Sequence, residues 1–174
     1  MISASEKAKR VIAIFPYVPD TSPVRMLRQR FDPLAALVPP HITLVFPFES
    51  DLTSEHLREH IQQAVANIKP FPVRLANVTG AEGEYLFLNV KQGNDDLIAL
   101  HDRLYMGPLA GFLSPHHTYV PHMTVGRLTD PAAWREAVFS AAGIDVRHDT
   151  IVHEISVYVI QGDGSRRIES VVPL

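Results

Sequence analysis

Pro40-His41-Ile42-Thr43-Leu44 is repeated in closely similar form, 81 residues further on, as Pro121-His122-Met123-Thr124-Val125. Each stretch contains a His-x-Thr triplet that follows a proline and has an apolar residue at its centre. The separation is close to half of the 174-residue chain. The repetition therefore indicates an ancient duplication in which both copies face one shared site.

The tripeptide alone carries little information, because His116-His117-Thr118 and His148-Asp149-Thr150 also match it among nine histidines. The alternation of faces along a strand distinguishes the two motif copies from these additional matches. Successive side chains of a β-strand point to opposite faces, so His and Thr share one face while the apolar residues share the other. The two additional matches place a polar residue where a buried one is required. Only the stretches around His41 and His122 fit a strand with a polar face on a site and an apolar face on a core.

Apolar periodicity and turn residues predict the elements around these two strands. Helices are expected after caps at 20–22, 53–54, 94–95 and 130. Residues 107–121 are expected to form a loop that borders the site and delivers the second motif strand. Strands are expected at 11–15, 41–48, 73–78, 85–90, 122–128, 151–160 and 167–172. Helices that alternate with groups of strands predict an α+β fold rather than a doubly wound parallel sheet.

Composition restricts the class of protein. The chain is 46% hydrophobic, with a mean hydropathy of +0.03, which is typical of one soluble globular unit. Residues 1–174 are too short for two ordinary domains, so we expect a single domain of two lobes, each contributing one motif. A net charge of −3 and a pI of about 6.3 provide no basic field for long nucleic acid. A small or end-recognised phosphate ligand fits better.

Other patterns exclude further classes of function. The chain has no cysteine, which excludes disulfides, thiolate nucleophiles and cysteine zinc sites. Residues 1–10 do not read as a signal peptide, and no segment approaches the roughly 18 apolar residues of a membrane span. We therefore expect a cytoplasmic protein.

Two groups of charged or titratable side chains have alternative interpretations. A metal site is disfavoured because neither a His-Glu-x-x-His motif nor a carboxylate-rich cluster accompanies the histidines. The histidines concerned are His116, His117 and His122, with His148 and His153 in reserve. Arg25, Arg28 and Arg30 are expected to form a solvated helix face, with a phosphate-binding patch as the minor alternative.

The chemistry of the repeated motif points to phosphate. Imidazole has an unperturbed pKa of about 6.5, so a histidine pair can hold one neutral base and one charged acid near neutral pH. In-line displacement at phosphorus needs these groups on opposite sides of a cleft. Threonine hydroxyls can donate to anionic oxygens. Arg127 and Phe46 each lie five residues after a motif histidine, which on an ideal strand is the opposite face.

Among these side chains, Arg127 could reach a phosphate if its strand bends. Phe46 and Tyr119 could stack on a base, because base–aromatic stacking is worth about 1–3 kcal/mol and tolerates any base. Core packing is the competing interpretation for Phe46, and a structural role is the competing one for Tyr119.

These residues resemble the 2H phosphoesterases, a superfamily that includes RNA 2′,3′-cyclic phosphodiesterases, also called 2′-5′ RNA ligases. The resemblance extends over the whole chain and is strongest at 40–46 and 121–127. It implies two related antiparallel sheets with outer helices, facing one another across a cleft. It also implies metal-independent, cofactor-free attack on a cyclic phosphate to leave a 2′-phosphate. One departure is Pro47-Phe48, where RNA-acting bacterial members commonly have Leu-Gly.

By the same resemblance, His41 would protonate the leaving ribose oxygen and His122 would deprotonate the attacking water. Thr43 and Thr124 would hydrogen-bond the phosphate oxygens. The implied partner is an RNA 2′,3′-cyclic phosphate end or a small nucleotide, bound by a monomer. The alternatives are a non-catalytic binding module for nucleotides or RNA ends, and a phosphodiesterase acting on 2′-5′-linked oligonucleotides or another cyclic phosphate.

Overall fold

The structure is a computed structural model that describes residues 7–174. Residues 1–6, on which the signal-peptide prediction partly depends, lie outside the described residues. The strands are β1 (Ala8–Ile14), β2 (Ile42–Ser50), β3 (Phe71–Ala81), β4 (Tyr85–Gln92), β5 (His122–Arg127), β6 (Arg147–Val152), β7 (Glu154–Ile160) and β8 (Arg166–Pro173). The helices are α1 (Pro23–Phe31), α2 (Ser54–Ala64), α3 (Asn94–Leu104), the 3₁₀ helix η1 (Gly107–Phe112) and α4 (Pro131–Ala142). Among residues 7–174, no helix is long and apolar enough to cross a membrane.

The strands form one curved antiparallel sheet in the order β6-β3-β4-β5-β2-β1-β7-β8. The prediction of an α+β fold with antiparallel strands is therefore confirmed, whereas the structure differs from the prediction of two sheets. Each half of the sheet contributes one motif strand, β2 or β5, and these strands are neighbours at the centre. A single residue pair, Ile42 with Met123, is in register between them. This short pairing connects the two halves into one sheet.

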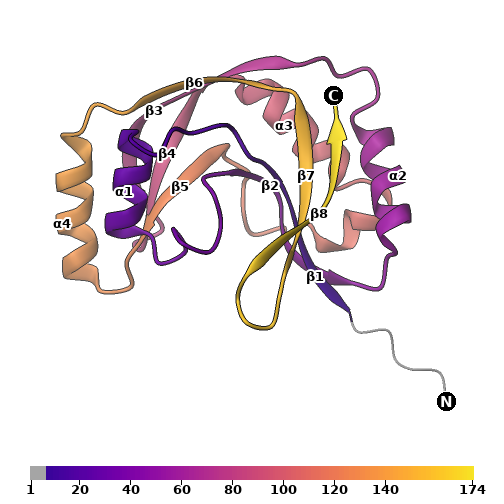
Figure 1. Cartoon of the computed structure of the whole chain (residues 1–174), viewed down its shortest axis with the longest axis horizontal. Helices are drawn as coiled ribbons and strands as arrows, with labels where there is room; N and C mark the ends of the chain where they lie inside the picture. Colours follow the sequence, from indigo (N-terminus) through magenta and orange to yellow (C-terminus); the bar gives the residue numbers. More distant parts are fainter. Residues whose placement is uncertain (1–6) are drawn as a thin grey trace.

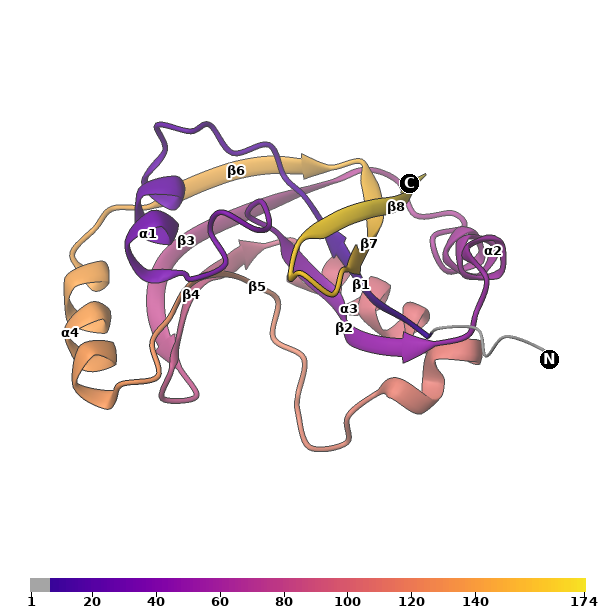
Figure 2. The ribbon, with the colours of Figure 1, turned by 60° about the horizontal axis from the view of Figure 1, so that its bottom comes forward.

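The helices cover the outer face of the arched sheet, two on each half (Figures 1 and 2). α1 packs on β5 and α4 on β3, while α3 packs on β2 and α2 on β8. The main core lies between the helices and the sheet, and the apolar residues of both motif strands are part of it. Burial of these residues fixes which face of each motif strand points away from the core.

Three of the helices begin at the predicted caps. Ser22 Oγ accepts from the Arg25 N–H, Thr53 Oγ1 from the His56 N–H, and Asp130 Oδ1 from the Ala133 N–H. The prediction was wrong for α3. That helix is preceded by Gly93, which has a φ of 87° and gives no side-chain cap. A left-handed glycine makes the entry turn there.

The region predicted as one strand at 151–160 is instead two strands, β6 and β7, with His153 between them. β6 pairs with β3, and β7 pairs with β1 in the other half of the sheet. The chain thus passes from one half to the other (Figure 1). Strand propensity cannot detect this break because both segments are extended. The predicted loop at 107–121 contains η1 at its start.

Each motif strand has an extra residue immediately after its threonine. Between Ala13–Thr43 and Ile12–Val45, β1 advances one residue while β2 advances two, so Leu44 is extra. Such a bulge reverses the alternation of faces that follows it. Leu44 and Val45 are consequently both buried. Phe46 then emerges on the same face as Thr43.

The second motif strand has the same irregularity. Between Leu86–Gly126 and Phe87–Thr124, β4 advances one residue while β5 advances two, so Val125 is extra. Val125 and Gly126 are both buried. Arg127 therefore returns to the face of Thr124, where it is in register with Tyr85.

Candidate active site

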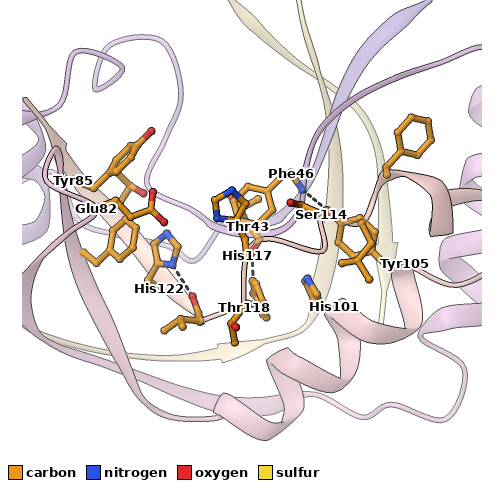
Figure 3. Close-up of a pocket in the computed structure, with 16 residues that line it drawn as sticks. Thr43, Phe46, Glu82, Tyr85, His101, Tyr105, Ser114, His117, Thr118 and His122 are labelled. Atoms are coloured by element: carbon orange, nitrogen blue, oxygen red, sulfur yellow. Dashed lines mark hydrogen bonds between the residues drawn. The ribbon is translucent and has the colours of Figure 1, made fainter. Parts of the chain in front are cut away.

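A cavity of about 440 Å³ lies where β2 and β5 separate beyond their single residue pair (Figure 3). Its lining includes Thr43 and Phe46 from β2, His122 and Thr124 from β5, and Tyr85 and Phe87 from β4. The C-terminal part of α3 and the loop that follows it supply His101, Tyr105 and residues 112–114 and 117–120. The predicted role of the 107–121 loop at the border of this cavity is confirmed.

His122 is held by its backbone surroundings and by an aromatic neighbour. Its Nδ1 lies 2.6 Å from the carbonyl oxygen of Val120, and its ring stacks on Phe87 with 3.5 Å between centroids. Because a carbonyl only accepts, Nδ1 carries the proton and Nε2 is left for a ligand. Desolvation by burial lowers the pKa of His122, while the Val120 hydrogen bond and the charge of Glu82 act in the opposite direction.

His41 has the same local geometry. Its Nδ1 donates over 2.9 Å to the carbonyl of Pro39, also two residues earlier, so its Nε2 is again free of that bond. Its ring lies 5.5 Å from that of Phe15 and 5.8 Å from that of Tyr158. Burial among these groups lowers the pKa of His41 to about 4, and the positive charge of Arg28 adds to this effect.

The pairing of Ile42 with Met123 brings the two motifs together. In an antiparallel pair, the residues on either side of a buried pair point to the opposite face. His41, Thr43, His122 and Thr124 accordingly border one place on the inner face of the sheet, and all four are partly buried. Thr43, His122 and Thr124 line the cavity, whereas His41 lies just outside its lining.

Two tyrosines bind the edge of β2 where β5 no longer pairs with it. The Tyr119 hydroxyl donates to the Thr43 carbonyl over 2.8 Å, and the Tyr105 hydroxyl accepts from the Phe46 N–H over 3.0 Å. The ring of Tyr119 stacks on His101 at 4.0 Å. The hydroxyl of Tyr119 thus fixes the backbone of a motif threonine, and its ring forms part of the cavity wall.

The two residues that the strand pattern placed on the wrong face are both near the cavity. Phe46 lines it and is 46% exposed. Arg127 does not line it, but its Nε–H donates to Glu84 over 3.1 Å and its guanidinium lies 5.3 Å from the ring centre of Tyr85, which does. The bulges explain both positions, and sequence alternation alone could not show them.

Several lining residues were missed at the sequence level. Glu82 follows β3 in a tight turn with a φ of 52°, a left-handed conformation that is uncommon for glutamate. Tyr85, Phe87 and His101 were each assigned only to a strand or a helix. The single available signal was alternation in β4, where Tyr85 and Phe87 share one face and Leu86 and Leu88 the buried one.

The histidines that were considered for a metal site lie at different places relative to the cavity. His117 lines the cavity and His116 is exposed beside it. Within residues 7–174, no three histidine or carboxylate side chains are grouped so that they could hold a metal ion.

Arg28 was predicted to be solvated, which is wrong, because it is only 2% exposed. It pairs with Asp32 at 2.8 Å and donates to the Val38 carbonyl at 2.9 Å. This buried charge therefore fixes the loop that leads to His41.

Comparison with known proteins identifies the family. The model of the 2′-5′ RNA ligase superfamily matches residues 15–164. A Geobacillus kaustophilus protein named "Putative phosphoesterase" is 34% identical over 157 residues, covering 88% of this chain and 89% of its own length. A protein of the same name from Bacillus licheniformis is 24% identical, covering 88% and 91%.

Solved structures show the same fold at low identity. Escherichia coli LigT complexed with 3′-AMP has a TM-score of 0.55 at 20% identity, covering 97% of this chain and 96% of that one. Kluyveromyces marxianus Usb1 has a TM-score of 0.51 at 14% identity, covering 97% and 98%. With the family model matching most of its length, the chain belongs to the 2′-5′ RNA ligase superfamily, the 2H phosphoesterases.

Proposed function

We propose that this protein hydrolyses a 2′,3′-cyclic phosphate, on an RNA end or a small nucleotide, to a 2′-phosphate. A water oxygen bonds to phosphorus, the bond from phosphorus to O3′ breaks, and one histidine takes the water proton while the other protonates O3′. Thr43 and Thr124 donate to the phosphate oxygens. The observation that carries the proposal is the pairing of Ile42 with Met123. On either side of this pair, the histidine and threonine side chains of both proline-preceded motifs lie on the inner face of the sheet.

The substrate class rests on additional support. LigT has been solved with 3′-AMP, ATP and NADP+. We assign Phe46 and the ring of Tyr119 to the walls that contact a base, and Arg127 at the rim to a phosphate oxygen. Attack by the 5′-hydroxyl of a second RNA end in place of water, with O3′ leaving as before, would give 2′-5′ RNA ligation. The protein would act as a cytoplasmic monomer with no cofactor.

The direction of proton transfer has two opposed indications. The family resemblance makes His41 the acid and His122 the base. By contrast, burial lowers the pKa of His41 to about 4, which keeps this imidazole neutral at pH 7 and suits a base. The carboxylate of Glu82 favours the charged form of His122. Bound phosphate would raise both pKa values.

Replacing each histidine by asparagine tests the proposal. His41→Asn and His122→Asn should each lower kcat for a nucleoside 2′,3′-cyclic phosphate by roughly 10²–10⁴-fold, measured with excess chelator. His116→Asn is the matched control because this exposed residue does not line the cavity. Undiminished turnover in both motif variants would overturn the proposal.

A substrate with a p-nitrophenolate leaving group assigns the acid. This group leaves without protonation, so the variant that lacks the acid should recover most of its activity, whereas the variant that lacks the base should not. Recovery in His122→Asn would reverse the order that the family resemblance implies.

The second candidate function is binding without turnover. The observation that favours it is burial, which lowers the pKa of both motif histidines and so disfavours the charged imidazole that must protonate a leaving group. A panel of cyclic nucleotides, cyclic-ended RNA and 2′-5′-linked oligonucleotides separates the possibilities. Tight binding with no product from any of them would favour the binding module. Cleavage of only the 2′-5′ linkage would change the substrate class.

A further inference from the structure

Besides the exposed His117, one buried histidine of the cavity lining has no part in the proposed reaction. His101, on α3, is only 5% exposed, yet it belongs to the cavity lining. Its Nδ1 lies 2.9 Å from Asp102 Oδ1, and its ring packs against those of Tyr119 and Tyr105, with centroids at 4.0 Å and 4.8 Å. A carboxylate and two aromatic rings thus hold this imidazole in one orientation.

The other ring nitrogen of His101 is left for a ligand. No residue among 7–174 makes a hydrogen bond to its Nε2, and this atom is not among the fully buried unpartnered ones, so it is open to a ligand in the cavity that His101 lines. An apolar side chain would pack against Tyr119 as well as the imidazole does, so packing alone does not explain a histidine at this position. Because Nδ1 donates to the Asp102 carboxylate, Nε2 donates into the cavity whenever the imidazole carries both protons.

The charges around the cavity favour an anion at this end. Its lining contains neither lysine nor arginine, so histidines are its only side chains that can become cationic. Glu82 lies with Tyr85 beside His122, and His101 lies with Tyr105 and Ser114 on the opposite side of Thr43 (Figure 3). An additional negative group on the substrate is therefore repelled more at the Glu82 end, where the carboxylate lines the cavity, than at the His101 end, where the Asp102 carboxylate pairs with the imidazole and does not line the cavity.

We propose that His101, oriented by Asp102, binds a second phosphate of the substrate, the one attached to the 5′ oxygen of the nucleotide whose cyclic phosphate is opened. This assignment rests on the proposed function and gives the substrate class: a nucleotide phosphorylated at both ends. The 5′ phosphate can be a terminal monoester or the next linkage of an RNA chain. Both present anionic oxygens to the same donor.

Binding of product-like ligands tests the second subsite without requiring turnover. Calorimetry at pH 6 compares adenosine 2′-monophosphate with adenosine 2′,5′-bisphosphate, and with a dinucleotide that carries a 2′-phosphate. A hydrogen bond to a charged group corresponds to a gain of about tenfold or more in affinity from the added phosphate. If both ligands gain, the donor accepts monoester and linkage alike. If the affinity rises for only one of the two ligands, that ligand shows whether the second phosphate is a terminal monoester or an RNA linkage.

His101→Gln should remove most of this gain. His60→Gln should retain it, because the imidazole of His60 bonds to the Leu104 carbonyl at 2.8 Å and does not line the cavity. Asp102→Asn should reduce the gain without touching the core, since the Asp102 side chain is 70% exposed. This variant decides the matter if His101→Gln does not fold.

The second subsite would be overturned if the added phosphate raised the affinity of the His101 and Asp102 variants as much as that of the natural protein. It would also be overturned if the added phosphate did not raise the affinity of the natural protein. Hydrolysis of a nucleoside 2′,3′-cyclic phosphate, measured separately, would leave the proposed function intact in either case. If the cyclic phosphate were not hydrolysed but the added phosphate still raised affinity through His101, the proposed function would be overturned and the anion site would stand.

Discussion

At the scale of single residues, both motif histidines are positioned in one way. A proline fixes the backbone before each imidazole, and Nδ1 donates to the carbonyl two residues earlier, at Pro39 or Val120. This bond selects the tautomer that leaves Nε2 as the reactive nitrogen. Their neighbours differ, however, with the positive Arg28 near His41 and the negative Glu82 near His122. One sequence motif thus yields two histidines with different charged neighbours.

Replacing Glu82 by glutamine should lower the pKa of His122 further. The negative charge of Glu82 raises this pKa against the larger effect of burial, so removing the charge destabilises the imidazolium. Titration of the imidazole signals by NMR measures the change. Glu84→Gln is the control, because Glu84 pairs with Arg127. A His122 pKa that stays constant in Glu82→Gln would show that the two groups are not coupled.

At the scale of elements, the bulges in β2 and β5 and the hydrogen bonds that support them create the site. The bulges turn Phe46 and Arg127 toward the inner face, and two tyrosine hydroxyls take the place of β5 along the edge of β2. A regular pair of strands would have continued the sheet and left no room for the cavity.

Tyr119→Phe should reduce turnover because it removes only the hydroxyl that holds the Thr43 carbonyl. The loss of one such bond corresponds to about 0.5–1.5 kcal/mol, so kcat should fall by up to about tenfold. KM should change less, because the ring remains in the wall. Tyr17→Phe is a matched control, since Tyr17 is 83% exposed and does not line the cavity. Equal kcat in both variants would exclude this positioning role.

Gly126→Ala should destabilise the packing of α1 on β5. An added Cβ would lie 2.8 Å from both Phe31 Cβ and Leu86 Cδ1, so the helix must shift. Overpacking of this kind costs about 1–3 kcal/mol, measured as the free energy of unfolding in urea. The control is Gly111→Ala, where no atom lies within 4 Å of the added carbon. Equal stability of the two variants would contradict the close approach of α1.

At the scale of the whole molecule, the sheet is held together at its centre and near its edge by different interactions. The centre depends on the short pairing of Ile42 with Met123 and on the helices that pack behind it. Near the edge, Arg10 on β1 makes two hydrogen bonds to Glu169 on β8, at 2.7 and 3.0 Å, and Ser54 adds one to the same carboxylate. This cluster connects α2 to two strands that are not neighbours.

Glu169→Gln should destabilise the protein by about 3 kcal/mol at pH 7, because the Arg10 charge is buried and loses its partner. Burial raises the pKa of Glu169, but the bonds from Arg10 and Ser54 outweigh it, so the folded-state pKa is lowered. The stabilisation is then complete above the ordinary glutamate pKa of about 4.3 and lost as the pH falls through the folded value. Urea unfolding of both proteins at pH 7 and pH 3 measures this. A difference independent of pH would contradict it.

The sequence by itself determined the family, the order of most elements and the two motif strands, because helix caps and alternation depend on neighbours along the chain. The caps at Ser22, Thr53 and Asp130 are examples. Only the tertiary structure decided the rest: the joining of β2 to β5, the faces of Phe46 and Arg127, the burial of Arg28 and the presence of Glu82 and His101 in the cavity. These features depend on strand register, bulges and the packing of residues distant in sequence. Such contacts leave no local pattern to read.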